Sequence, residues 1–137
     1  MREKKRILFR KELPQLTPMM DHRYFQRYLE DQCKAGLSSE KAGNLLLGRD
    51  CPIARFLREE CEFVDPVTGL KDIKVTEKGE RKKYRWPQWA QVFYYRRPTG
   101  SSPFEEEPTY QRCLDRIRIC EKTGAHGFGD EDGEYTA

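Results

Sequence analysis

The residues with the clearest chemical meaning form one block, between positions 71 and 97, in which basic and aromatic side chains alternate. The block holds nine lysines and arginines against three acidic residues, a local excess of +6. Lysine and arginine neutralise phosphates, and flat rings stack on unpaired bases. The candidate contacts to nucleic acid or to another partner are therefore Lys74, Lys78, Arg81, Lys82, Lys83, Arg85, Trp86, Trp89, Arg96 and Arg97.

The same block has a second interpretation, which the sequence leaves open. Aromatic side chains are usually buried, and basic hairpins are common on protein surfaces. In that case the two tryptophans belong to the core and the charges only face solvent. The block contains no RNP1 sequence, helix-turn-helix or KH loop that would decide between the two.

Metal and thiol chemistry is weakly indicated. The five cysteines include no closely spaced pair of the kind that structural zinc requires, so we expect buried thiols and no metal site. Their odd number and irregular spacing argue against disulfides and suggest a reducing, cytoplasmic setting. Cys51 is the first candidate for a reactive thiol, because it falls in the first turn of a predicted helix, but packing is the better interpretation.

The remaining motifs do not predict an enzyme. His22 and His126 have no serine or cysteine partner by spacing, and we expect a surface or capping role for each. The segment 38–41 matches Ser-x-x-Lys without its companion motifs, and the glycines of 124–129 form neither a P-loop nor a dinucleotide fingerprint. We therefore expect no catalytic residue and no cofactor.

Length and composition predict a single small domain. The chain has 137 residues, of which 36% are charged, so a modest core with a densely charged surface is expected. No apolar run approaches the ~18 residues that span a membrane, and residues 1–12 lack the apolar stretch of a secretion signal. Charge is segregated, with a basic start, a basic middle and an acidic end.

Helices are predicted in the first half of the domain. Residues 1–16 are a basic arm or strand. A helix begins at Thr17, with Met20, Tyr24, Phe25, Tyr28, Leu29 and Cys33 on its apolar face, and ends at Gly36. A second, shorter helix follows over 38–48, capped by a serine. A third helix is capped by Asp50 and runs to Cys61.

A hairpin is predicted in the middle. Residues 65–69 are a turn, Ile73 and Val75 lie on a strand, 77–80 form the hairpin tip, and 81–86 return. On such a hairpin Lys74, Lys78, Arg81, Lys83 and Arg85 share one face. Residues 87–97 are preferred as a helix, although a strand is open. A last helix runs from 108 to 122, and 124–137 is an acidic, disordered tail. Residues 17–123 are thus one α+β domain.

The order of several short motifs resembles small uncharacterised proteins of bacterial viruses and their hosts. The matching residues are Cys51-Pro52-Ile53-Ala54-Arg55-Phe56-Leu57, Ile73-Lys74-Val75, Pro87-Gln88-Trp89-Ala90-Gln91-Val92-Phe93 and Pro103-Phe104. The resemblance covers about the middle 40% of the chain. It implies no activity, but it favours the helix over 87–97 and a viral or mobile-element setting.

The sequence therefore predicts a small non-enzymatic binding protein. Its expected partner is a nucleic acid, or a protein complex that handles one, bound through the basic hairpin; a viral accessory factor is one form this could take. The alternative is a pure protein-interaction module that uses acidic clusters and exposed aromatic residues. Steep weakening of binding by salt distinguishes phosphate contacts from most protein interfaces.

Overall fold

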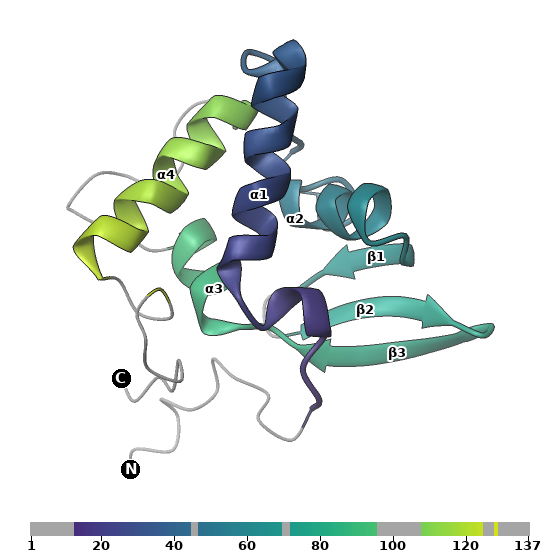
Figure 1. Cartoon of the computed structure of the whole chain (residues 1–137). Helices are drawn as coiled ribbons and strands as arrows, with labels where there is room; N and C mark the ends of the chain where they lie inside the picture. The colour runs from purple at the N-terminus through teal and green to yellow at the C-terminus, as the bar shows by residue number, and fades with distance from the viewer. Residues whose placement is uncertain (1–12, 45–46, 70–71, 96–107, 125–127, 129–137) are drawn as a thin grey trace.

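The computed structural model describes residues 13–44, 47–69, 72–95, 108–124 and 128 (Figure 1). It combines helices with one three-stranded antiparallel sheet in the order β1-β2-β3, which confirms the predicted α+β class. The hairpin of β2 and β3 projects away from the helices (Figure 1). No described helix is long and apolar enough to cross a membrane. The predicted arm lies almost wholly outside the described residues.

The first long helix, α1 (His22–Gln32), begins later than predicted. Thr17 does not cap it but opens a 3₁₀ turn, η2 (Thr17–Met19), that contains Pro18. Asp21 is the cap, because its carboxylate accepts a hydrogen bond of 2.9 Å from the backbone N–H of Arg23. An aspartate and a threonine are both good caps, so the pattern alone did not separate the two starting points.

The buried face of α1 is narrower than predicted. Phe25, Tyr28 and Leu29 are buried as predicted. Met20 and Tyr24, which were predicted on the same face, are 60% and 55% exposed. The helix continues as a wider turn, η3 (Cys33–Leu37), in which Gly36 adopts a φ of +89° and ends the helical path, as predicted.

The second predicted helix is wrong: no helix occurs among the described residues of 38–50. The backbone N–H of Ala42 instead donates to Pro108 O at 2.7 Å, and Lys41 forms a bridge with Thr109. At Gly43, φ is +149° and an added Cβ would lie 2.4 Å from Asp50 O, so the chain passes too closely for another residue. Leu45 and Leu46 lie outside the described residues.

The third predicted helix is confirmed as α2 (Pro52–Arg55), which continues as the wider turn η4 (Phe56–Glu60). Its first residue is preceded by Cys51 in the cap position, not by Asp50. The Asp50 carboxylate accepts a hydrogen bond of 2.9 Å from Arg55 Nε, so this acid stabilises the helix through a side chain and not through the backbone.

The predicted turn over 65–69 is instead a strand, β1 (Val64–Thr68), which pairs with β2. The strand is irregular: its register shifts between Val64 and Val67, and Asp65 has a φ of +51°. A bulge of this kind tolerates the Asp-Pro step, which by itself is typical of a turn.

The hairpin is confirmed, with β2 (Asp72–Glu77) and β3 (Glu80–Arg85) in continuous register. Two residues connect them, Lys78 and Gly79, with φ values of +53° and +81°. Positive φ at both positions is the signature of the type I′ turn, whose twist matches that of the strands. The turn fixes the register and therefore decides which side chains share a face.

Two further helices complete the fold: α3 (Gln88–Tyr95), which confirms the helical alternative for this segment, and α4 (Tyr110–Thr123). Thr109 caps α4, and Gly124, with a φ of +68°, ends it as predicted. The predicted apolar face of α4 is buried throughout. Its members are Tyr110, Cys113, Leu114, Ile117 and Cys120.

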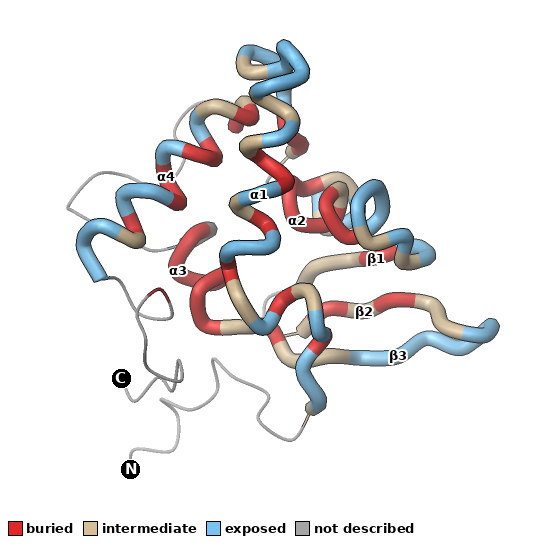
Figure 2. Tube along the Cα trace, in the orientation of Figure 1, coloured by how far each residue is buried: buried red, intermediate tan, exposed pale blue. Residues whose placement is uncertain are grey.

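The core lies between the helices and one face of the sheet, and Figure 2 shows buried residues on α1, α2, α3, α4, β1 and β2. Phe25 is at its centre, with ring centroids 5.5 Å from Phe56, 5.8 Å from Trp89 and 5.4 Å from Phe93. Phe128 is buried as well, 6.2 Å from Trp89. The packed structure therefore extends into the segment predicted as a tail, whose other residues from 125 on are not described.

Candidate nucleic-acid interface

The register of the hairpin divides its basic residues between two faces. Side chains alternate along a strand, and residues opposite each other on antiparallel strands share a face. Ile73 and Val75 are buried, so theirs is the inner face of the sheet. The outer face carries three cross-strand pairs, which are Asp72 with Arg85, Lys74 with Lys83, and Thr76 with Arg81.

Four of the five residues predicted to share a face therefore do so. The exception is Lys78, which lies in the turn. Lys82 is opposite Val75 and so belongs to the inner side of the hairpin. It is nevertheless exposed, unlike Val75. β3 is exposed from the tip to Lys83 (Figure 2). The hairpin thus presents an outer basic face and, on its other side, an isolated lysine that is useful as a control.

The central pair of the outer face, Lys74 and Lys83, places two like charges directly opposite each other. The side chain of neither lysine forms an ion pair or hydrogen bond with any residue in the described part of the chain. Like charges in this position destabilise a sheet, whereas the flanking pairs join an acid to a base and a hydroxyl to a base. The folded protein therefore keeps two opposed lysine charges at the centre of this face, and neither is paired with an acid in the described part of the chain.

Arg81 has a different role, because the fold already uses its guanidinium. Its Nη1 donates to Thr76 Oγ1 at 2.9 Å and to Asp65 O at 2.7 Å, and it lies 3.5 Å from Asp65 Oδ2. Asp65 also pairs with Arg49 at 2.7 Å. Arg81 thus ties β3 to β1 across β2 at the position of the bulge, and it adds positive charge at the rim of the outer face.

The tryptophans of the block belong to the core. Trp86 is 0% and Trp89 2% exposed, and Trp89 Nε1 donates to Met19 O at 2.9 Å. Burial removes both rings from the residues that can contact a partner. Tyr84 lies opposite Ile73 and so on the inner side, where its hydroxyl donates to Glu77 Oε1. Arg96 and Arg97 lie outside the described residues.

All five cysteines are free thiols that are wholly or partly buried. Cys51 is 1% exposed, and its thiol is 2.9 Å from Thr68 Oγ1, with which it forms a hydrogen bond. Burial raises the pKa of Cys61 and of Cys120 to about 11, and it raises the pKa of Cys113 as well, so these thiols stay protonated at neutral pH. Among the described residues no group of three or more potential ligands is placed to hold a metal ion.

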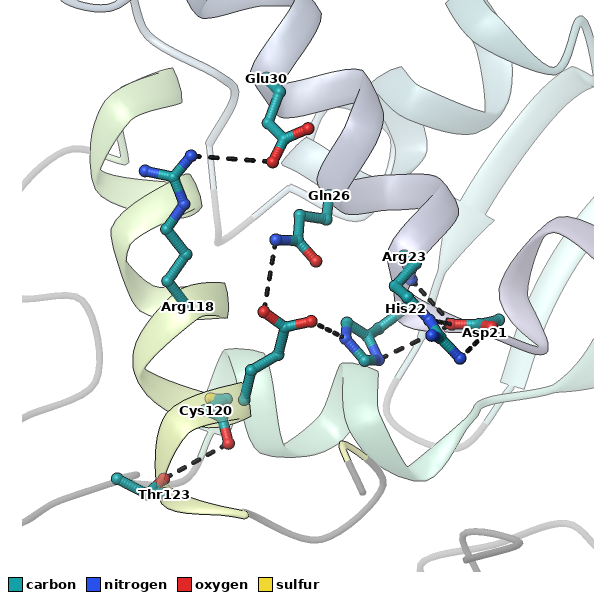
Figure 3. Close-up of polar contacts among 9 residues, drawn as sticks. Asp21, His22, Arg23, Gln26, Glu30, Arg118, Cys120 and Thr123 are labelled. Carbon is teal, nitrogen blue, oxygen red and sulfur yellow. Dashed lines mark hydrogen bonds and ion pairs between the residues drawn. The ribbon is translucent and has the colours of Figure 1, made fainter. Parts of the chain in front are cut away.

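One buried polar cluster was not foreseen. His22 is 6% exposed, not on the surface as predicted, and its Nε2 lies 2.7 Å from Glu121 Oε2 while its Nδ1 lies 3.8 Å from Asp21 (Figure 3). Gln26 also donates to Glu121, at 3.3 Å. No sequence signal links residues 99 positions apart.

The arrangement explains how α1 and α4 are joined. The His22 ring packs against Phe128, with centroids 4.7 Å apart, and edge-on against Trp89 at 6.3 Å. Glu30 and Arg118 add a second link between the same helices at 3.7 Å (Figure 3). The thiol of Cys120 on α4 is buried, and burial raises its pKa to about 11.

No family model matches the chain, and no curated protein or solved structure is significantly similar to it. The geometry of the hairpin is therefore the observation from which a function can be proposed.

Proposed function

We propose that this protein is a non-enzymatic binding protein that contacts nucleic acid through the outer face of its hairpin. The observation that supports the proposal is the Lys74–Lys83 pair, two opposed lysines without an anionic partner in the described part of the chain. A phosphate group supplies the missing negative charge. Binding would turn an unfavourable cross-strand contact into a favourable one, because one anion can interact with both ammonium groups.

The surroundings of the pair favour an extended anion over a small one. Arg81 and Arg85 lie two residues on either side of Lys83 on the same face, so its four cations outnumber the two acids beside them, Asp65 and Asp72. The face is the surface of a sheet, and a small anion would remain solvated on it. A polyanion that crosses the sheet meets several cations at once.

The proposal is tested with variants that lose one or both of the opposed lysine charges and with a control that loses one charge elsewhere on the hairpin. Lys74→Gln and Lys83→Gln remove the two opposed charges, while Lys82→Gln removes an equal charge from the neighbouring position on the inner side. We expect the double variant Lys74→Gln/Lys83→Gln to bind a fluorescent nucleic acid at least about tenfold more weakly at 0.1 M salt. We expect Lys82→Gln to bind almost as well as the unmodified protein.

If Lys74→Gln, Lys83→Gln and Lys82→Gln each weakened binding equally, the proposal would be contradicted. The loss of affinity would then reflect net charge and not contacts with the outer face. Far-UV circular dichroism and a urea unfolding curve are recorded for every variant, so that a folding defect is not mistaken for lost binding.

A protein partner is the second candidate, and one observation favours it. Met20, just before α1, and Tyr24, in its first turn, are 60% and 55% exposed. Exposed aromatic residues of this kind are enriched at protein interfaces. If a partner protein co-purifies after nuclease treatment, and Tyr24→Ala releases it while Lys83→Gln does not, the interaction module is the better description.

A further inference from the structure

The outer face of the hairpin, described by the pairs 72–85, 74–83 and 76–81, contains no aromatic residue. The rings that the sequence interleaves with its charges are elsewhere. Trp86 and Trp89 are in the core, and Tyr84 faces the inner side with its hydroxyl held by Glu77. Among the described residues this face can therefore offer charge and hydrogen-bond donors, but no ring on which an unpaired base could stack.

We infer that the ligand of this face is double-stranded nucleic acid, bound through its phosphates without stacking and without sequence preference; this inference rests on the proposed function. Proteins that bind single strands gain about 1–3 kcal/mol for each base stacked on a ring. Without that gain, a flexible single strand loses conformational freedom on binding and receives only charge contacts in return.

The spacing of the cations suits a rigid ligand. Arg81, Lys83 and Arg85 alternate along β3, which places successive side chains about 6.6–6.8 Å apart. Lys74 faces Lys83 from β2 at a Cβ separation of about 4.5–5.5 Å. Hydrogen bonds of the sheet fix the backbone positions of this array, and the contacts of Arg81 hold its guanidinium in place before any ligand arrives. A duplex presents phosphates that are equally fixed, at about one charge per 1.7 Å of axis.

The width of the sheet argues against contacts with base edges inside a groove of the duplex. Up to Thr76 the sheet has three strands, because Val64 of β1 pairs with that residue. Three strands spaced about 4.8 Å apart are broader than the two-stranded ribbon that the major groove of DNA admits, and much broader than a minor groove about 6 Å wide. The lysines of this face are therefore expected to meet the sugar–phosphate backbone, which is common to all sequences.

The test compares probes of one sequence in three forms: duplex DNA, duplex RNA and single-stranded DNA, each with the same fluorophore. Anisotropy titrations of the full chain are run at one low salt concentration. We expect the duplexes to bind at least about fivefold more tightly than the single strand, because only they match the fixed array. An unlabelled duplex of unrelated sequence should compete as well as the unlabelled probe. The preference between DNA and RNA identifies which duplex is the ligand.

Tighter binding of the single strand, or competition that depends on sequence, would overturn the inference and leave the proposed function standing. Absence of binding to all three probes would overturn both. Lys74→Gln/Lys83→Gln is measured beside the unmodified protein, and it should weaken binding to the duplex much more than binding to the single strand. Equal weakening on both probes would show that the array has no preference for a rigid ligand and would also contradict the inference.

Discussion

The proposed function depends on Lys74 and Lys83. Their opposed charges favour the binding of an anion but lower the stability of the sheet. Each lies opposite the other on the outer face, and neither forms an ion pair with an acid among the described residues. A sheet selected only for stability would place an acid at one of these positions. Residues that lower stability at a site of function are a common compromise in proteins.

Lys83→Glu should therefore stabilise the fold while it weakens nucleic-acid binding. Replacing one member of a like-charge pair with an acid creates an opposite-charge pair, which is worth about 0.2–1 kcal/mol on a sheet. The urea midpoint of unfolding should rise. Lys82→Glu is the control and should not raise the midpoint, because Glu80 lies two residues away on the same side. A lower midpoint for Lys83→Glu would show that the pair is not repulsive in the folded state.

The ionisation of Asp50 should make the stability of the protein depend on pH. Its hydrogen bond from Arg55 lowers the pKa of the carboxyl in the folded state below the ordinary value of about 4. A lowered folded pKa contributes stability that is fully present above the unfolded pKa and is lost as the pH falls through the folded pKa. The loss should therefore occur below about pH 4.

Asp50→Asn should consequently show a smaller fall in stability between pH 6 and pH 3 than the unmodified protein. Urea midpoints at the two pH values are the measurement. The effect should be modest, because the carboxyl is partly exposed and solvent screens it. An identical fall in both proteins would mean that the contact with Arg55 does not contribute to the stability of the folded state.

At the scale of elements, the hairpin could be predicted because its signals are local. Ile73 and Val75 alternate with polar residues, and a glycine lies in the two-residue turn. β1 could not be predicted, because Asp65 and Pro66 are typical turn residues and only the bulge and the pairing with β2 explain them. The false helix over 38–48 has the same cause, since Ala42 and Lys41 are held extended by contacts with 108 and 109.

Gly79→Ala tests the turn on which the register depends. The φ of +81° at this position is strained for alanine, while an added Cβ would meet no atom within 4 Å. The expected loss is therefore conformational only, on the order of 1 kcal/mol, measured as a lower urea midpoint. Gly36→Ala, at φ +89° and equally open, is the comparison away from the sheet. An unchanged midpoint for Gly79→Ala would contradict the type I′ turn and, with it, the assignment of faces.

At the scale of the molecule, the helices form a scaffold that holds the hairpin by one face. The His22–Glu121 contact joins α1 to α4 on this scaffold, away from the basic face, and the ring of His22 is packed against Phe128. The sequence shows neither this contact nor the burial of Trp86 and Trp89, because both depend on residues distant in the chain. Composition alone does not show whether the aromatic residues of the block are buried in the core or form a binding surface.

His22→Ala should destabilise the protein by about 1–3 kcal/mol, because it removes a buried ring and leaves Glu121 without its imidazole partner. Glu30→Gln is the matched control: it breaks the longer, more exposed contact with Arg118 between the same helices, and it should change stability by less than about 0.5 kcal/mol. Duplex binding of both variants should be unchanged below the unfolding transition. Lost binding in folded His22→Ala would place part of the interface on the helices.

The most direct test of the central claim is the salt dependence of duplex binding by the unmodified protein and by Lys74→Gln/Lys83→Gln. Each phosphate neutralised on duplex DNA contributes about −0.9 to the slope of log K against log salt concentration. If both lysines contact phosphates, the double variant should have a slope shallower by nearly 2, and Lys82→Gln should keep the original slope. Identical slopes for the unmodified protein and the double variant would show that the opposed lysines do not contact phosphates and would contradict the account.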